Sequence, residues 1–124
     1  MKVEISFNDN GQVDRNGRYY PTEVEKAALE EFVKEHEGQY VYLHLGQNAS
    51  TEVDPLRGIP AKDITLTDKG LECELMLDCP SGRVLDILAK QGASFSIRPR
   101  YVGDVDENNE VKDLHLVTFD IVAK

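Results

Sequence analysis

Residues 93–122 read ASFSIRPRYVGDVDENNEVKDLHLVTFDIV, two β-type runs on either side of a polar segment. Apolar and polar residues alternate in the first run, which predicts a strand from Ala93 to Val102. The polar residues 104–109 predict a turn. The second run, Val111 to Val122, predicts a last long strand that can bend midway. Two long strands in so short a stretch indicate that the chain is β-rich.

Upstream of residue 93, the spacing of apolar residues switches between the strand period and the helix period. The predicted elements, in chain order, are a strand at residues 3–7, a helix at about 23–36 with Thr22 as its cap, a strand at 40–45, a long connection at 46–62, a hairpin of residues 64–67 and 71–77, and a helix at about 83–91. The second helix is expected to bury four apolar residues, Val84, Leu85, Ile87 and Leu88, and to end at Gly92. A connection as long as 46–62 is typical of a functional loop.

This order of elements, strand, helix, strand, hairpin, helix, strand, strand, predicts the fold class. It is typical of an α+β domain that is rich in β-structure. We expect a partly closed, mostly antiparallel β-barrel flanked by two helices. The length of 124 residues suits one domain, so residues 1–124 are expected to fold as a single unit.

Composition and motifs exclude several classes of protein. The formal net charge of −9 repels phosphate backbones and argues against nucleic acid as the main partner. No stretch approaches the roughly 18 apolar residues of a membrane span, and Glu4 interrupts any export signal, so we expect a soluble protein with no membrane partner. Cys73 and Cys79 have the spacing of neither a redox pair nor a zinc site. With no nucleotide-binding or metal-ligand motif, we expect no cofactor and no metal.

One face of the strand that begins at Ala93 gathers polar side chains. Alternation places two hydroxyls and two guanidiniums together, those of Ser94, Ser96, Arg98 and Arg100. A serine needs a base to lose its proton, and guanidinium or backbone N–H groups can stabilise the oxyanion that its attack creates. On this pattern alone, a polar outer face without chemistry remains the favoured interpretation.

Two further residues could take part in such chemistry. His44 ends the strand at 40–45, just before the long connection, and histidine is the usual general base, although a lone strand histidine is more often a surface residue. Asp120 lies among apolar residues of the last strand and must be paired if it is buried. Its partner is either a histidine that it orients or the guanidinium of Arg98 or Arg100.

Three stretches, taken together, add a resemblance to a known family. They are DRNGRYYP at 14–21, LDCPSGRVL at 77–85, and the strand Gly92 to Gly103 with its FSIR, followed by the closing FDIV at 119–122. They resemble N-x-NGR-x-YP, L-D-T-P-x-G-K-x-L, G-[IV]-S-S-R-G-x-G and F-D-[IL]-V of the prohead core proteases of tailed phages, whose fold is similar to that of the herpesvirus assemblins. The ordered set spans nearly the whole chain.

The resemblance implies a serine endopeptidase of prohead maturation. Ser96 matches the first serine of the family strand and is implied to be the nucleophile. His44, 52 positions earlier, is implied to be the base, and Asp120 stands where a third, acidic member is sought. Ser94, Arg98 and Arg100, with backbone amides near Arg98, are the expected oxyanion and substrate-binding groups.

The same resemblance implies partners and leaves one alternative open. The expected partners are phage scaffold and major capsid precursor proteins, met in the host cytoplasm inside the assembling prohead, and the barrel relatives suggest a homo-oligomer. However, His44 stands in LHLGQN where the family commonly has G-E-L-D-H-P, and Ile97 replaces the second serine. The alternative is therefore a non-catalytic capsid-assembly or scaffold-binding module with the same fold.

Overall fold

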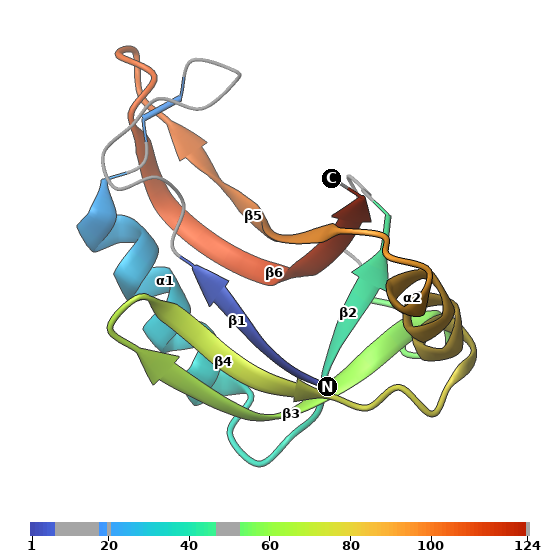
Figure 1. The fold of residues 1–124 in the computed structure, drawn as a ribbon. Coiled ribbons are helices and arrows are strands. Elements are labelled where there is room, and N and C mark those ends of the chain that lie inside the picture. The colour runs from blue at the N-terminus through green and yellow to red at the C-terminus, as the bar shows by residue number, and fades with distance from the viewer. Residues whose placement is uncertain (7–17, 20, 47–52, 124) are drawn as a thin grey trace.

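The computed structural model describes residues 1–6, 18–19, 21–46 and 53–123, which form one six-stranded sheet and two helices (Figure 1). The elements are β1 (Lys2–Ser6), α1 (Thr22–Glu35), β2 (Val41–Leu45), β3 (Gly58–Thr67), β4 (Gly70–Leu75), α2 (Pro80–Lys90), β5 (Phe95–Val105) and β6 (Val111–Ala123). Phe7 of the predicted first strand and residues 14–17 and 20 of the first family stretch lie outside the described residues, as do 47–52 of the predicted connection.

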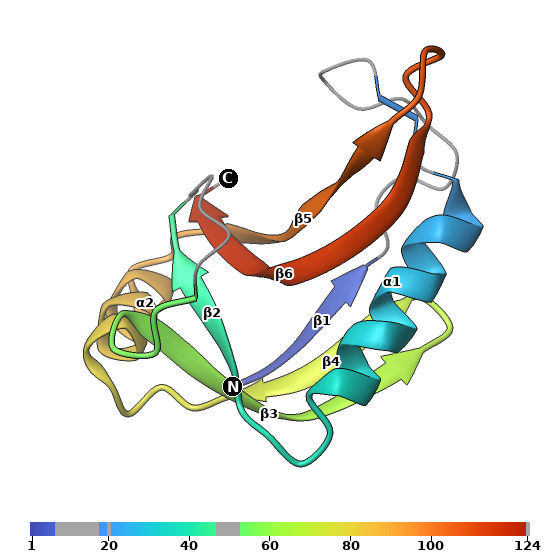
Figure 2. The ribbon, with the colours of Figure 1, turned by 180° about the vertical axis from the view of Figure 1, so that it is seen from behind.

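The sheet is strongly curved and has the order β1-β4-β3-β2-β6-β5. Its strand pairs are antiparallel except for β2 and β6, which run parallel and join the two halves. Figures 1 and 2 show that the β5–β6 pair bends away from the β1–β4–β3 half, so that the sheet forms half of a barrel. The prediction of a β-rich α+β fold with a partly closed barrel and two helices is confirmed.

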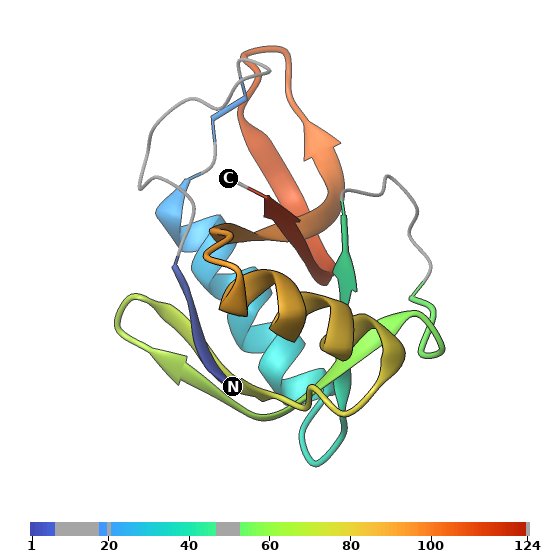
Figure 3. The ribbon, with the colours of Figure 1, turned by 45° about the vertical axis from the view of Figure 1, so that its right-hand side comes forward.

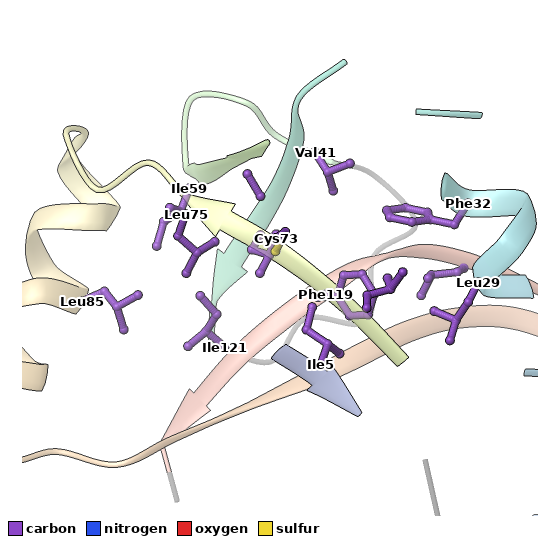
Figure 4. Close-up of a cluster of buried hydrophobic side chains, with 14 residues drawn as sticks. Ile5, Leu29, Phe32, Val41, Ile59, Cys73, Leu75, Leu85, Phe119 and Ile121 are labelled. Carbon is purple, nitrogen blue, oxygen red and sulfur yellow. The ribbon is translucent and has the colours of Figure 1, made fainter. Parts of the chain in front are cut away.

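The hydrophobic core fills the inside of the curved sheet. Every strand except β5 contributes buried apolar side chains, and β5 adds the partly buried Phe95 and Ile97. Figure 4 shows that Leu85 of α2 and Phe32 of α1 enter this core from opposite sides. The rings of Phe32 and Phe119 meet edge to face, with their centroids 5.6 Å apart. Both helices are therefore attached to the same core.

The starts of both helices differ from the prediction. In α1 it is Pro21, and not Thr22, that occupies the N-cap position, and no side chain caps this end. Helix α2 begins at Pro80, three residues before the predicted start, because proline fits the first turn, where its missing N–H has no partner to lose. Cys79 is its N-cap, since its Sγ accepts a hydrogen bond from the Gly82 N–H at 3.2 Å. Gly92 ends the helix as predicted, at a φ of +88°.

Helix α2 also buries less than was predicted. It lies beside β2 and β3 (Figure 3) and turns one edge toward them. Of the four apolar residues that were predicted to be buried, only Leu85 is, whereas Val84, Ile87 and Leu88 are 48%, 55% and 38% exposed. The spacing of these apolar residues therefore predicted the helix correctly, but the prediction that all four are buried was wrong.

The predicted connection at 46–62 and the hairpin turn are both shorter in the structure. Strand β3 already begins at Gly58, because residues 58–61 pair with β2. The turn between β3 and β4 holds two residues and not three, since Gly70 pairs with Thr67. Residues 53–57 of the predicted connection thus lead directly into β3, which pairs with β2, the strand that carries His44.

Candidate active site

Three neighbouring strands, β2, β6 and β5, bring the predicted site residues onto one face of the sheet. His44 of β2 pairs with Asp120 of β6 in the parallel register, and Asp120 pairs with Arg98 of β5 in the antiparallel register. Side chains of paired residues point to the same side of a sheet. Ser96 lies two residues before Arg98 and therefore on this face too. We call it the polar face, and it is opposite to the core.

The polar face is anchored by a buried ion pair. Asp120 is 4% and Arg100 7% exposed. The Arg100 Nε donates to Asp120 Oδ2 at 3.0 Å, and its Nη2 donates to Oδ1, so the pair is bidentate. Next to it, the Thr118 hydroxyl donates to the Tyr42 carbonyl at 2.6 Å and ties β6 to β2. Of the partners left open for Asp120 by its sequence, the guanidinium of Arg100 is thus one that the structure shows.

His44 is buried beside this pair, with 8% of its surface exposed. Its Nε2 accepts a hydrogen bond from the backbone N–H of Asp54 at 3.2 Å. Burial lowers the pKa of His44 below its ordinary value of 6.5, and the Arg100 guanidinium lowers it further, while the Asp120 and Asp54 carboxylates oppose the shift. At neutral pH the imidazole is therefore uncharged, which is the form that can accept a proton.

Ser96 is half-buried on β5, which is an edge strand of the sheet. Strand β6 lies between β5 and β2, so two inter-strand spacings, about 10 Å, separate the backbones that carry Ser96 and His44. In the part of the chain that the structure describes, no hydrogen bond joins these two side chains. Ser96 pairs with Val122, two residues beyond Asp120, so contact between the two side chains requires both to reach diagonally across β6.

The remaining predicted residues lie around Ser96. Arg98 is exposed on the same face, two residues after Ser96. Ser94 is exposed and precedes the first residue of β5. Arg100 differs from both, because its guanidinium is buried and bound to Asp120. The structure therefore places Arg98 and Ser94 where a ligand can reach them, and Arg100 beneath the surface.

One contact of the site was not predicted from the sequence, the backbone N–H of Asp54. Asp54 opens a turn in which its carbonyl accepts from the N–H groups of Arg57 and Gly58, at 3.1 and 3.0 Å. Its carboxylate accepts from the Leu56 N–H at 3.0 Å. Asp-Pro at 54–55 is a sequence signal for such a turn. It does not say which side chain the turn will meet.

Three other features, a cluster of possible metal ligands, a buried thiol and a surface groove, are separate from the predicted site. Among the described residues, one group could hold a metal ion, the exposed Glu31, Glu35 and His115 on α1 and β6. Cys73 is buried, and this burial raises the pKa of its thiol to about 11. A surface groove of about 590 Å³ lies between the end of α1 and β3, lined by Lys34, Tyr40 and other residues. None of these belongs to the predicted site.

Comparison with known proteins supports the fold. No protein-family model matches the chain, and no curated protein matches it. The solved structure of the bacteriophage T4 capsid assembly protease, gp21, superimposes with a TM-score of 0.80 over 98% of this chain and 80% of that chain. The chain has the fold of a phage capsid assembly protease.

The identity between the two sequences is 20%, so this likeness establishes the fold and not the activity. The fold implied by the three family stretches is thereby confirmed. Neither helix in the described ranges has the length and apolar character to cross a bilayer.

Proposed function

We propose that this protein is a serine endopeptidase of phage capsid assembly. The observation that carries the proposal is the register of β2, β6 and β5, which puts His44, Asp120 and Ser96 on one face of a sheet with the fold of a capsid assembly protease. A serine, a buried neutral histidine and a carboxylate are the groups that acyl transfer uses.

In the proposed reaction, the Ser96 Oγ attacks the carbonyl carbon of the scissile peptide bond. Its proton passes to a ring nitrogen of His44 as the new C–O bond forms. The C–N bond then breaks, and His44 returns the proton to the leaving amine. Water repeats the sequence on the acyl-enzyme and regenerates the Ser96 hydroxyl. The lowered pKa of His44 favours the neutral form that the first step needs.

Asp120 and the arginines have separate parts in this proposal. The Asp120 carboxylate, fixed by Arg100, is the register neighbour of His44 and stabilises the imidazolium that forms. The exposed Arg98 and the backbone N–H groups around it are the oxyanion donors, apart from Pro99, which has no N–H. Ser94 contacts the substrate next to the nucleophile. Arg100 acts as a positioning residue through Asp120.

The proposed substrates are scaffold and major capsid precursor proteins, cleaved inside the assembling prohead. The support for them is the likeness to gp21, a capsid assembly protease, together with the family stretches in the sequence. Incubation of the purified chain with a scaffold–capsid precursor mixture, followed by mass spectrometry of the fragments, tests this part. If the precursors stay intact while the same enzyme preparation reacts with a fluorophosphonate, the proposed substrates are wrong.

A second candidate is a non-catalytic assembly module with the same fold. Two observations favour it: no hydrogen bond joins His44 and Ser96 in the described part of the chain, and the His44 Nε2 is already occupied by Asp54. The module would bind scaffold or capsid protein without cleaving it. Its affinity for those proteins would not change when the Ser96 hydroxyl is removed.

Labelling with a fluorophosphonate and cleavage of a precursor-derived peptide distinguish the two candidates. We expect Ser96→Ala to abolish both, because the hydroxyl is the nucleophile. Ser94→Ala is the control for a neighbouring hydroxyl that is exposed and outside β5. It should retain the labelling, which needs only the nucleophile and its base, while its peptide cleavage falls because a substrate contact is lost. Labelling of Ser96→Ala at the wild-type rate would exclude Ser96 as the nucleophile.

A further inference from the structure

The backbone N–H of Asp54 fixes the protonation of the His44 ring. An N–H group can only donate, so the His44 Nε2, 3.2 Å away, must be the acceptor. A neutral imidazole whose Nε2 accepts carries its proton on Nδ1. The nitrogen lone pair at Nε2, which is one of the two positions that could take a proton from a serine, is thus engaged in the structure.

The turn that presents this N–H is closed by several independent contacts. The Asp54 carbonyl accepts from the N–H groups of Arg57 and Gly58, and its carboxylate accepts from Leu56. Ser81 of α2 donates its hydroxyl to the Arg57 carbonyl at 2.8 Å. Asp54 thus closes the turn from its start, and Ser81 holds the turn at its end.

Gly58 brings the turn back directly beside His44. It pairs with His44 in the β2–β3 register. A Cβ at Gly58 would lie 2.7 Å from the Cβ of Tyr42, a separation that real Cβ atoms do not show. Only glycine therefore allows β3 to approach β2 this closely, and in this arrangement the Asp54 N–H lies within hydrogen-bond distance of the His44 Nε2.

The charged groups around His44 support the same state. They are the Arg100–Asp120 pair from β5 and β6 and the Asp54 carboxylate from the turn. Burial and Arg100 lower the pKa of His44, so the ring is neutral and its Nε2 has a lone pair to offer. Burial and charge thus make the ring neutral, and the contact with the Asp54 N–H selects the tautomer.

We propose that Asp54 is a positioning residue that holds His44 in a resting state: its N–H keeps the ring proton on Nδ1 and occupies Nε2 until substrate binding displaces the turn at 54–57. The catalytic consequence rests on the proposed function, because it requires His44 to activate Ser96. The tautomer itself does not, since it follows from the contact between Asp54 and His44.

The tautomer is measured by long-range ¹H–¹⁵N NMR of the full chain at pH 7, with His44→Gln to assign the signals. We expect a protonated Nδ1 and an unprotonated Nε2 in the wild type. Asp54→Pro lacks the N–H, so we expect its His44 population to shift toward the Nε2–H tautomer. A wild-type ring with its proton on Nε2 would overturn the proposal.

Reactivity of Ser96 toward a fluorophosphonate tests the resting state. We expect Asp54→Pro to react about three- to tenfold faster than the wild type, the effect of removing one hydrogen bond from the base. Asp54→Gly keeps the N–H but loses the carboxylate that accepts from Leu56, and should give a smaller increase. Asp54→Asn keeps the N–H and a side-chain oxygen that can accept from Leu56, and it is the matched control, with a rate close to the wild type expected. Loss of the Asp54 charge lowers the pKa of His44 further, so the ring stays neutral.

The outcomes separate this proposal from the proposed function. If Asp54→Pro does not fold, Asp54→Gly against Asp54→Asn still provides the comparison, and equal rates in that pair would overturn the resting state. An Nδ1–H ring with equal labelling in all variants would also overturn it and leave the protease proposal standing. Absence of labelling in every protein, the wild type included, would overturn the proposed function, and the NMR result would then decide the positioning role alone.

Discussion

Asp120 is the residue on which the polar face depends. Its carboxylate is buried between two strands, faces His44 in one register and binds Arg100 from the other side. A buried carboxylate without a counter-charge costs several kcal/mol, and the guanidinium offsets that cost through two hydrogen bonds. The ion pair therefore fixes the position of the carboxylate relative to the imidazole.

We predict that Asp120→Asn lowers the free energy of unfolding by about 3 kcal/mol, because it removes the negative charge opposite a buried guanidinium. Urea denaturation followed by circular dichroism measures this. Asp104→Asn is the control, since Asp104 is exposed on β5, and it should change stability by less than about 0.5 kcal/mol.

A double variant tests the cause of that loss. Asp120→Asn with Arg100→Met removes both charges and keeps the volume of the long side chain, so it should recover part of the lost stability. If the double variant is as unstable as the sum of the two single variants, the loss does not come from the unbalanced charge. The coupling energy of the double-mutant cycle gives the answer.

The polar face was predictable only in part from the sequence. Alternation along β5 correctly placed Ser96, Arg98 and Arg100 on one side, because the two-residue period of a strand is a local property. It could not show that His44 would lie next to Asp120, since 76 residues separate them and only the parallel pairing of β2 with β6 joins them. The Asp54 N–H was missed because every residue except proline has one.

At the scale of the element, α2 shows why its start was misplaced. Pro80, Ser81 and Gly82 are typical of a turn, and cysteine is not among the usual N-cap residues. In the structure all three residues form the first turn of the helix, and Gly82 packs against the backbone of Leu77. Residues that commonly form turns therefore begin this helix, with Cys79 as the cap and with Gly82 close to the backbone of Leu77.

This contact makes Gly82 a sensitive position. A Cβ there would lie 2.5 Å from the Leu77 carbonyl oxygen, so we predict that Gly82→Ala destabilises the protein by about 1–3 kcal/mol, although alanine is the better helix former. Val84→Ala, at an exposed position two residues further along α2, is the control and should cost less than about 1 kcal/mol. Thermal unfolding of the two variants at equal concentration measures the difference, and a stabilised Gly82→Ala would show that the helix start is free to shift.

At the scale of the whole molecule, the parallel pair β2–β6 joins two antiparallel units into one half-barrel. The fold class was predictable, because the sequence of strand and helix periods is encoded locally. The strand order was not, since it depends on which distant strands bury their apolar faces together. The resemblance to the prohead proteases predicted the fold as a whole without a strand order, and that fold agrees with the structure.

Phe32 is one of the buried residues that attach helix α1 to this half-barrel; it is 2% exposed and meets Phe119 of β6 edge to face. We predict that Phe32→Ala lowers the free energy of unfolding by about 3–5 kcal/mol, a large share of the 5–15 kcal/mol typical of a domain. Phe32→Leu should cost less, and Lys26→Ala on the exposed side of α1 should cost almost nothing.

The same substitution should reach the candidate site on the other side of the sheet. Phe119 directly precedes Asp120, so a cavity under Phe119 loosens the strand that carries the Asp120–Arg100 pair. We therefore expect fluorophosphonate labelling of Ser96 in Phe32→Ala to be lost over the same temperature range in which its circular dichroism signal is lost, and several degrees below the wild type. Labelling that persists after α1 has unfolded would show instead that the three-strand site is stable without the helix.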